Sequence, residues 1–186
     1  MTAGQGLTSA QRYADVAIAS RTGTYDYYNV AVGGATCLDR DTAASAVGGA
    51  DKILAAHQAT GATISIECGL NDLYNGATPA TAMSRILTYV ANRKAAGWRN
   101  VIVFTNTDAS TVNETDRATL NASIVSNAGA NGYTVADVGS DGNLGCNGCD
   151  MNATYFQSDH VHPTATGQSL IATGYLEPIF TTLGIN

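Results

Sequence analysis

The alternation of short apolar runs with longer segments of helical period is the feature that most constrains how this chain folds. Val101–Phe104 is an uninterrupted apolar run of strand length, whereas Met83, Ile86 and Val90 recur at helical spacing. This alternation is typical of an α/β domain built on a mainly parallel sheet. The chain has 186 residues, 45% of them hydrophobic, which is enough for one core, and we expect a single domain over residues 1–186.

The expected elements follow from hydrophobic periodicity and from turn and capping residues. Strands are expected at Tyr27–Val32, Thr63–Glu67, Val101–Phe104 and Tyr133–Val138. Helices are expected at Thr8–Ser20, at Asp41–Ala59, from Thr78 until Gly97 stops the helix, at Asn113–Ala128, and from just after Pro163, with Pro178 near the end of the last one. Gly48 and Gly49 weaken the second of these helices, and Gly139–Ser158 is expected to be a long loop.

Composition and charge exclude several classes of partner. Nine Lys and Arg against fifteen Asp and Glu give a formal net charge of −6, so no nucleic-acid partner is expected. No apolar stretch reaches the roughly 18 residues of a membrane helix, and Met1–Gln5 does not resemble a signal peptide, so no membrane partner is expected. The low charge suits a secreted or phage-borne protein as well as a cytosolic one, and secretion is the working hypothesis for localisation.

The four cysteines are compatible with two disulfides, although their number does not give the pairing. Cys146 and Cys149 form a Cys-x-x-Cys motif in a loop rich in glycine and asparagine, where a local disulfide is a better interpretation than a redox centre. Cys37 and Cys68 are single cysteines and do not supply the second ligand pair that a structural zinc site needs. We expect no metal and no cofactor, and four unpaired thiols remain the alternative.

The strongest local signal is an aspartate three residues before a histidine, Asp159 and His162, at the start of a predicted helix. A carboxylate bonded to Nδ1 of an imidazole fixes its tautomer, so that the other nitrogen can accept a proton from a hydroxyl. The pattern indicates that His162 is a general base and Asp159 its orienting partner. The alternative is a helix-capping aspartate beside an incidental surface histidine, and His57 and His160 are interpreted as surface residues.

Two further polar turns follow predicted strands. Gly33-Gly34 comes after the first of them and Gly69–Asp72 after the second. The carboxyl ends of parallel strands meet at one edge of a sheet, where ligands usually bind. A glycine lets its backbone N–H approach a ligand closely, and an asparagine side chain offers a second N–H, which together suit an oxyanion site for acyl transfer. Taken singly, each segment is also consistent with an ordinary turn.

Gly33-Gly34, Gly69–Asp72 and the Asp159–His162 pair follow one another in the order of three motifs of the SGNH hydrolases, also called GDSL esterases and lipases. The chain therefore resembles that family. The resemblance implies a flavodoxin-like three-layer α/β/α sandwich and ester hydrolysis through a serine acyl-enzyme, with no cofactor. It implies that Gly34 and Asn71 are oxyanion donors, that Asp159 orients the base, and that His162 is the base. Gly34 is preferred to Gly33 as the donor because it stands five residues after Asn29, as the corresponding glycine does in the family. The implied substrate is a small ester or an acylated carbohydrate, with an acetyl or short acyl group.

The sequence departs from the family pattern at its amino end, where a strand ending in Gly-Asp-Ser is expected. It opens Met1-Thr2-Ala3-Gly4, which resembles the segment that follows the family's serine. We therefore expect the first strand and the nucleophile to be absent from the chain as given. In the strand order 2-1-3-4-5 that strand is internal, and each buried backbone group left unpaired costs about 1–3 kcal/mol. Folding then requires direct pairing of its neighbours, strand exchange in a homo-oligomer, or a longer polypeptide.

Two functions follow from these observations. The first is an SGNH-type ester hydrolase, which the retained Asn71, Asp159 and His162 favour. The second is a non-catalytic glycan-binding or structural module on an SGNH scaffold, which the absent serine favours. The other serines considered as nucleophiles lack the surroundings of a nucleophile turn: Ser9, Ser65, Ser110 and Ser158.

Overall fold

A three-stranded parallel sheet forms the centre of the computed structural model, which describes residues 6–46, 49–57 and 62–185. Within these residues the strand order is β1-β2-β3, formed by Thr63–Ile66, Asn100–Phe104 and Thr134–Ala136. Ile64 lies opposite Val101, and Ile102 lies opposite Thr134. Three of the predicted strands are therefore confirmed, and their carboxyl ends lie at one edge of the sheet.

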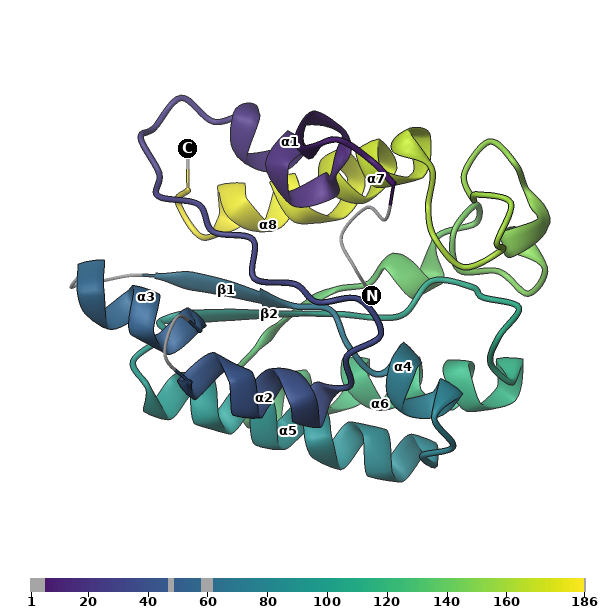
Figure 1. The fold of residues 1–186 in the computed structure, drawn as a ribbon, viewed down its shortest axis with the longest axis horizontal. Coiled ribbons are helices and arrows are strands. Elements are labelled where there is room, and N and C mark those ends of the chain that lie inside the picture. Colours follow the sequence, from purple (N-terminus) through teal and green to yellow (C-terminus); the bar gives the residue numbers. More distant parts are fainter. Residues whose placement is uncertain (1–5, 47–48, 58–61, 186) are drawn as a thin grey trace.

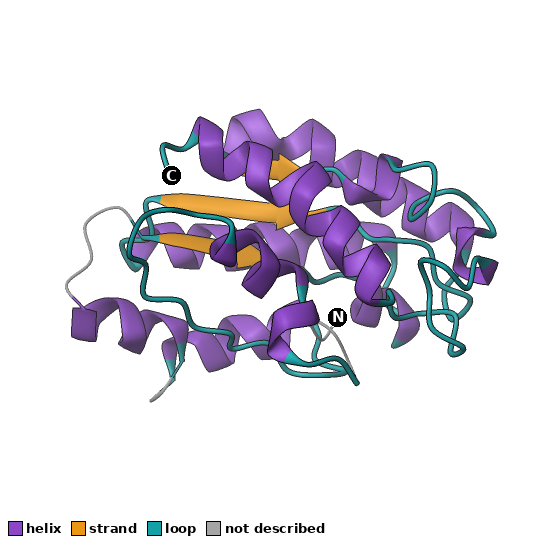
Figure 2. Ribbon diagram, turned by 90° about the horizontal axis from the view of Figure 1, so that it is seen from above, coloured by secondary structure: helices purple, strands orange, loops and turns teal. Residues whose placement is uncertain are grey.

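Helices cover both faces of this sheet (Figures 1 and 2). The lower layer in Figure 1 contains α2 (Cys37–Ser45), α3 (Ala50–His57), α4 (Leu70–Tyr74), α5 (Pro79–Ala95) and α6 (Glu114–Asn131). The upper layer contains α1 (Tyr13–Ala19), α7 (Ala165–Ile171) and α8 (Glu177–Thr182), with a π-helical segment at Ala172–Leu176. Short 3₁₀ helices occur at Ser9–Gln11, Val138–Ser140 and Cys149–Met151. The layers agree with the predicted α/β/α sandwich, and no described helix is long and apolar enough to span a membrane.

The sheet divides the buried core into two parts, and β2 contributes to both. Val101 and Val103 pack among side chains of α5 and α6, whereas Ile102 and Phe104 pack among those of α1, α7 and α8. All four of these side chains are at most 3% exposed. A parallel strand covered on both faces is apolar at every position, which is why the uninterrupted apolar run in the sequence predicted this one.

The helix α5 follows its sequence signals closely. Thr78 Oγ1 accepts the N–H of Thr81 at 3.2 Å, and Pro79 occupies the first turn, where its missing N–H costs nothing. Gly97, with φ of 105°, adopts the positive φ that ends the helical path after Ala96. Because the capping residues and the apolar stripe indicate the same helix bounds, both ends of this helix were predictable.

Two predicted helices differ from the structure in extent. The segment predicted as one helix at Asp41–Ala59 is two, since α2 ends at Ser45 and α3 begins at Ala50. Gly49 lies between them, and glycine disfavours a helix interior, while Gly48 and residues 58–59 lie outside the described residues. At the amino end, Arg12 has an extended ψ of 140°, so α1 begins only at Tyr13.

Pro178 lies near the end of the carboxy-terminal helical region, as predicted, and the region continues past it to Thr182. The chain stays helical from Ala165 to Thr182, with the π-helical segment immediately before the proline-containing turn. Proline has no N–H and its ring clashes with the preceding turn, so a wider turn at this point accommodates it without ending the helix.

The predicted strand Tyr27–Val32 is not a strand in the structure. The segment runs alongside β1 (Figures 1 and 2), but no backbone hydrogen bond joins it to the sheet within the described residues. The carbonyl of Val30 accepts from the Arg40 guanidinium at 2.6 Å instead. A strand needs a neighbouring backbone with which to form a ladder, so the strand preference of these residues is not realised.

Two disulfides join the four cysteines. Cys37–Cys68 links the first turn of α2 to the loop after β1 across 31 residues, and this pairing was left open by the sequence. Cys146–Cys149 closes a local loop with a separation of 3, as predicted.

We predict that replacing both Cys37 and Cys68 with alanine lowers the free energy of unfolding by about 3–4 kcal/mol, because their disulfide closes a long loop. Replacing Cys146 and Cys149 should lower it by less than about 2 kcal/mol, because that loop is short. Urea denaturation followed by circular dichroism measures both. Equal losses for the two pairs would contradict the loop-length argument.

Candidate active site

The candidate base and its orienting carboxylate meet in one turn before α7. His162 Nδ1 lies 2.7 Å from Asp159 Oδ2. The other carboxylate oxygen accepts the backbone N–H groups of Val161 and His162, each at 3.0 Å. The imidazole is 18% exposed and the carboxylate 42%. Three hydrogen bonds thus fix the carboxylate against the Nδ1 side of the ring, leaving Nε2 available as a proton acceptor.

Hydrogen bonding favours the ionised form of Asp159. Partial burial raises the pKa of this carboxyl, but the bonds from the His162 amide and ring and from the Val161 amide outweigh burial, so the pKa lies below its usual value. The carboxylate is therefore charged throughout the neutral range and can stabilise an imidazolium at His162.

His160 holds this turn against the rest of the molecule. It has a positive φ of 56°, which is uncommon for a residue with a side chain. Its backbone carbonyl accepts from the Ser110 N–H at 3.1 Å, and its Nδ1 lies 3.0 Å from the carbonyl oxygen of Asp150. Its backbone N–H donates to Gln157 at 3.0 Å. These contacts fix the positive-φ backbone between Asp159 and His162, so His160 has a structural role that the sequence did not indicate.

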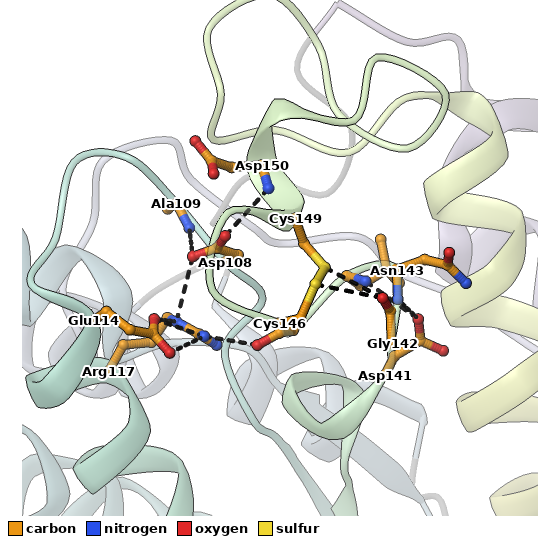
Figure 3. Close-up of a disulfide and its surroundings, with 12 residues drawn as sticks. Asp108, Ala109, Glu114, Arg117, Asp141, Gly142, Asn143, Cys146, Cys149 and Asp150 are labelled. Carbon is orange, nitrogen blue, oxygen red and sulfur yellow. Dashed lines mark hydrogen bonds and ion pairs between the residues drawn. A yellow bond between two sulfur atoms is a disulfide. The ribbon is translucent and has the colours of Figure 1, made fainter.

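The loop before the turn is closed by the Cys146–Cys149 disulfide and anchored at Asp141 (Figure 3). Both sulfur atoms lie near the carbonyl of Gly142, at 3.4 and 3.3 Å. One oxygen of Asp141 accepts the N–H groups of Asn143 and Leu144, and the other accepts the Tyr175 hydroxyl at 2.7 Å. The loop is therefore connected to the π-helical segment above the sheet.

Arg117 of α6 connects the same loop to the end of β2 (Figure 3). Its guanidinium is 2% exposed and donates to the carbonyls of Asn106 and Gly145 at 3.0 and 2.7 Å. It also pairs with Glu114 at 2.7 Å and lies 3.7 Å from Asp108. A buried cation with this many partners fixes the loop that leads to the candidate base.

Asp150 is a buried carboxyl that faces another carboxyl. Its backbone N–H donates to Asp108 Oδ2 at 3.2 Å. Burial raises the pKa of Asp150, and the hydrogen bond and like charge of Asp108 raise it further, while His160 acts in the opposite direction. These effects favour the protonated form of Asp150, which can donate a hydrogen bond to Asp108, more than they would in an exposed aspartate.

The predicted oxyanion donors come together at the carboxyl edge of the sheet. Asn71 Nδ2 donates to the carbonyl of Ala35 at 3.0 Å, which leaves the second N–H of the amide available. Gly34, one residue before Ala35, has φ of 73°, and a side chain at this position would point into open space. No described residue accepts the Gly34 N–H. The two segments are adjacent as predicted, with a donor available from each.

Asp72 fixes these donors and was not recognised as important from the sequence. Its side chain is fully buried, and it accepts the Cys37 N–H at 2.9 Å while pairing with Arg85 at 2.9 Å. The Cys37–Cys68 disulfide crosses the same junction. Gly69, with φ of 109°, starts α4, and a side chain there would meet Leu120 at 2.9 Å. The signal that was available is the position of Asp72 directly after Asn71.

Glu67, directly after β1, is a carboxyl whose pKa is raised. Burial raises the pKa of this carboxyl, while the Tyr13 hydroxyl that bonds to it and the charge of His162 lower it. Tyr13 is 5% exposed in α1, and its backbone N–H donates to Gln168 of α7 at 2.8 Å. Neither Glu67 nor Tyr13 belongs to a motif that the sequence made recognisable.

The parallel α/β/α fold is that of the SGNH class of hydrolases, and Gly34, Asn71, Asp159 and His162 follow one another in the order of that class's motifs. The sequence profile of the GDSL-like Lipase/Acylhydrolase family matches residues 1–170. The chain belongs to that family. No curated protein sequence matches the chain.

Solved structures share the fold at low sequence identity. A member of the lipolytic protein G-D-S-L family from Veillonella parvula DSM 2008 matches with a TM-score of 0.73 and 17% identity, covering 97% of this chain and 93% of that one. TesA matches with a TM-score of 0.72 and 17% identity, covering 98% and 94%. LAE5, an alpha/beta hydrolase enzyme from the metagenome of Lake Arreo, Spain, matches with a TM-score of 0.56 and 15% identity, covering 82% and 69%. These similarities confirm the predicted fold.

We predict that Asp159→Asn lowers the free energy of unfolding by about 1 kcal/mol at pH 7, because the amide is a weaker acceptor than the carboxylate. The folded-state pKa of Asp159 is below its unfolded value, so the contribution is full above the unfolded pKa and is lost as pH falls through the folded pKa. The difference from wild type should therefore shrink below about pH 4. Urea titrations from pH 7 to pH 3 measure it. Ser158→Ala is the control, and an equal pH dependence in that variant would contradict the assignment.

We predict that the effect of Asp150→Asn on the free energy of unfolding depends on pH in the opposite sense to that of Asp159→Asn. The folded-state pKa of Asp150 is above its unfolded value, so wild-type stability declines as pH rises from the unfolded pKa through the folded pKa. Asparagine retains a donor toward Asp108 and carries no charge, so the variant should be more stable than wild type at pH 7 and equal to it near pH 3. The same urea titrations test this, and a variant that is less stable at pH 7 would contradict it.

Proposed function

We propose that the chain is an ester hydrolase that acts through a serine acyl-enzyme on acetyl or short-chain acyl esters, including acylated carbohydrates. The coarse class follows from family membership over residues 1–170. The observation that carries the proposed mechanism is the 2.7 Å hydrogen bond between His162 Nδ1 and Asp159. This bond directs the free nitrogen of the ring to act as a base.

In the proposed reaction, His162 Nε2 takes the proton of a serine hydroxyl while the serine oxygen bonds to the ester carbonyl carbon. The resulting oxyanion accepts hydrogen bonds from the Gly34 N–H and the free N–H of Asn71. The tetrahedral intermediate collapses, the bond to the alcohol oxygen breaks, and His162 returns the proton to that oxygen. Water then repeats the sequence on the acyl-enzyme and releases the acid.

The nucleophilic serine is proposed to come from outside the described residues. Among the described residues, the structure shows no hydrogen bond between a serine hydroxyl and His162, and Ser158 is the sequence neighbour of Asp159, which bonds to Nδ1 of the ring. The roles of Gly34, Asn71, Asp159 and His162 are the most specific part of the proposal. They are supported by the tethers that bring Gly34 next to Asn71 and by the short aspartate–histidine bond.

We predict that the chain as given hydrolyses p-nitrophenyl acetate at a rate close to background, and that the same chain preceded by a strand ending in Gly-Asp-Ser is active. In the extended protein, His162→Ala should lower kcat by about 10³-fold or more. Asn71→Ala should lower it by about 10²-fold, because one oxyanion donor is lost. Release of p-nitrophenolate measures all of these rates.

Asn127→Ala is the matched control for Asn71→Ala, since Asn127 lies on α6 and donates only to the Ser123 carbonyl at 2.9 Å. Its activity should equal that of the unsubstituted protein. Equal activity of the original and extended proteins would overturn the proposed source of the serine. A third outcome is that the original and extended proteins are both folded by circular dichroism but inactive, while calorimetry detects binding of acetylated sugars. In that case the glycan-binding function replaces the hydrolase function.

A further inference from the structure

A chain of contacts between an aspartate, a histidine and a tyrosine lies outside the candidate active site. Tyr28 Oη lies 2.6 Å from His57 Nε2. On the other side of the ring, His57 Nδ1 lies 3.3 Å from Asp26 Oδ2. His57 is the last residue of α3, which precedes β1, whereas Asn71 lies on α4 beyond the other end of that strand (Figure 1). The cluster of Asp26, Tyr28 and His57 is therefore separate from the oxyanion donors.

The polarity of these contacts fixes where the protons lie. An ionised carboxylate can only accept, so the neutral ring carries its hydrogen on Nδ1, toward Asp26. In that tautomer Nε2 has a free lone pair, and the hydroxyl of Tyr28 is its donor. The tyrosine hydrogen is therefore directed at a ring nitrogen that can remove it.

This order of groups is that of an activated nucleophile. A carboxylate positions an imidazole, and the far nitrogen of the imidazole faces a hydroxyl at a distance suited to proton transfer. His57 resembles His162 in having Nδ1 directed at an aspartate, at 3.3 Å in one and 2.7 Å in the other. At His57 the hydroxyl that faces the other nitrogen belongs to a described residue, Tyr28.

The cluster is open to solvent. Tyr28 is 47% exposed, and the side chains of His57 and Asp26 are 40% and 71% exposed. Water competes for polar groups with this much exposure, so the contacts contribute little to stability. A small molecule in solution can reach the hydroxyl of Tyr28, which a buried cluster of the same groups would not allow.

We propose that Tyr28 is a nucleophile that accepts an acyl group from an activated ester, with His57 as its general base and Asp26 as the residue that positions this base. The substrate class is an ester whose alcohol leaves as a stable anion, such as a nitrophenyl ester, because its leaving group needs no proton. The product is an ester of the tyrosine side chain. The reaction proposed at His162 uses none of these three residues, so the two proposals are independent.

In this step the Tyr28 oxygen bonds to the carbonyl carbon of p-nitrophenyl acetate while its proton moves to His57 Nε2. The tetrahedral intermediate collapses, and the bond to the p-nitrophenyl oxygen breaks. The electron pair of that bond leaves with p-nitrophenolate. Asp26 stabilises the positive charge on His57 until the imidazolium releases its proton to water. One acetyl group is transferred to the protein, and nothing is oxidised or reduced.

Mass spectrometry of peptides tests the proposal on the chain as given. The protein is incubated with p-nitrophenyl acetate at neutral pH and quenched in acid, and acetylation of Tyr28 and Tyr74 is followed in the same samples. Tyr74 is the internal control, because it is 63% exposed and no described histidine is hydrogen-bonded to it. Tyr28 should be acetylated at least about tenfold faster than Tyr74. Exposure alone predicts the opposite order.

Substitutions separate the roles of the base and of its carboxylate. His57→Phe should slow acetylation of Tyr28 by about 10²-fold and leave Tyr74 unchanged, because the general base is lost. Asp26→Ala should slow it less, since the imidazole remains, and Asp26→Glu should restore part of the rate. Asp116→Ala, at an exposed aspartate in the first turn of α6, is the matched control and should react as the unsubstituted protein does. The comparison of the two tyrosines in the unsubstituted protein stands even where a variant fails to fold.

Three results would overturn the proposal. One is equal acetylation of Tyr28 and Tyr74. Another is unchanged acetylation of Tyr28 in His57→Phe together with a lower free energy of unfolding, which would identify a purely structural contact. The third is an acetyl group on the ring of His57 that persists in Tyr28→Phe, which would identify the histidine as the nucleophile. Sustained ester turnover by the extended protein is a separate measurement, so failure of one proposal does not decide the other.

Discussion

Backbone pairing on only one side of β1 is the constraint on which the rest of this structure depends. Its inner edge is paired with β2, and this pairing sets the register that brings the strand ends to one side. Its outer edge is unpaired within the described residues. The described backbone of Tyr27–Val32 forms no hydrogen bond with this edge. The same missing pairing creates a cavity beside β1 that opens toward both helical layers.

The candidate site is held together by ties that do not pass through this open edge. Asp72, with the Cys37–Cys68 disulfide, fixes the Gly34 turn against the segment that bears Asn71. Arg117 and Asp108 fix the loop that leads to His162. Both groups of contacts use buried polar or covalent links from loops to the lower helical layer. The proposed oxyanion donors and the aspartate–histidine pair therefore keep their local geometry beside a sheet edge that is unpaired within the described residues.

Prediction succeeded where local signals agree with one another. The apolar run of β2, the Thr78 cap of α5 and the Asp159–His162 spacing each depend on residues close in sequence, and the structure contains all three features. The helix at Asp41–Ala59 was predicted too long because the break near Gly49 is a local preference whose outcome depends on packing. The bonding partners of Asp72 and His160 could not be predicted, because they come from distant segments.

The sequence by itself determined the α/β class, the three strands of the sheet, and the residues that make an SGNH-type site recognisable, because periodicity and motif spacing are local properties. Tertiary structure decided which cysteines pair and how Asp72 ties the donors together. It also decided that Tyr27–Val32 is not a strand, although its residues favour one. The physical reason is that a side chain's preference is a property of the residue, whereas a ladder requires a second backbone at the right distance.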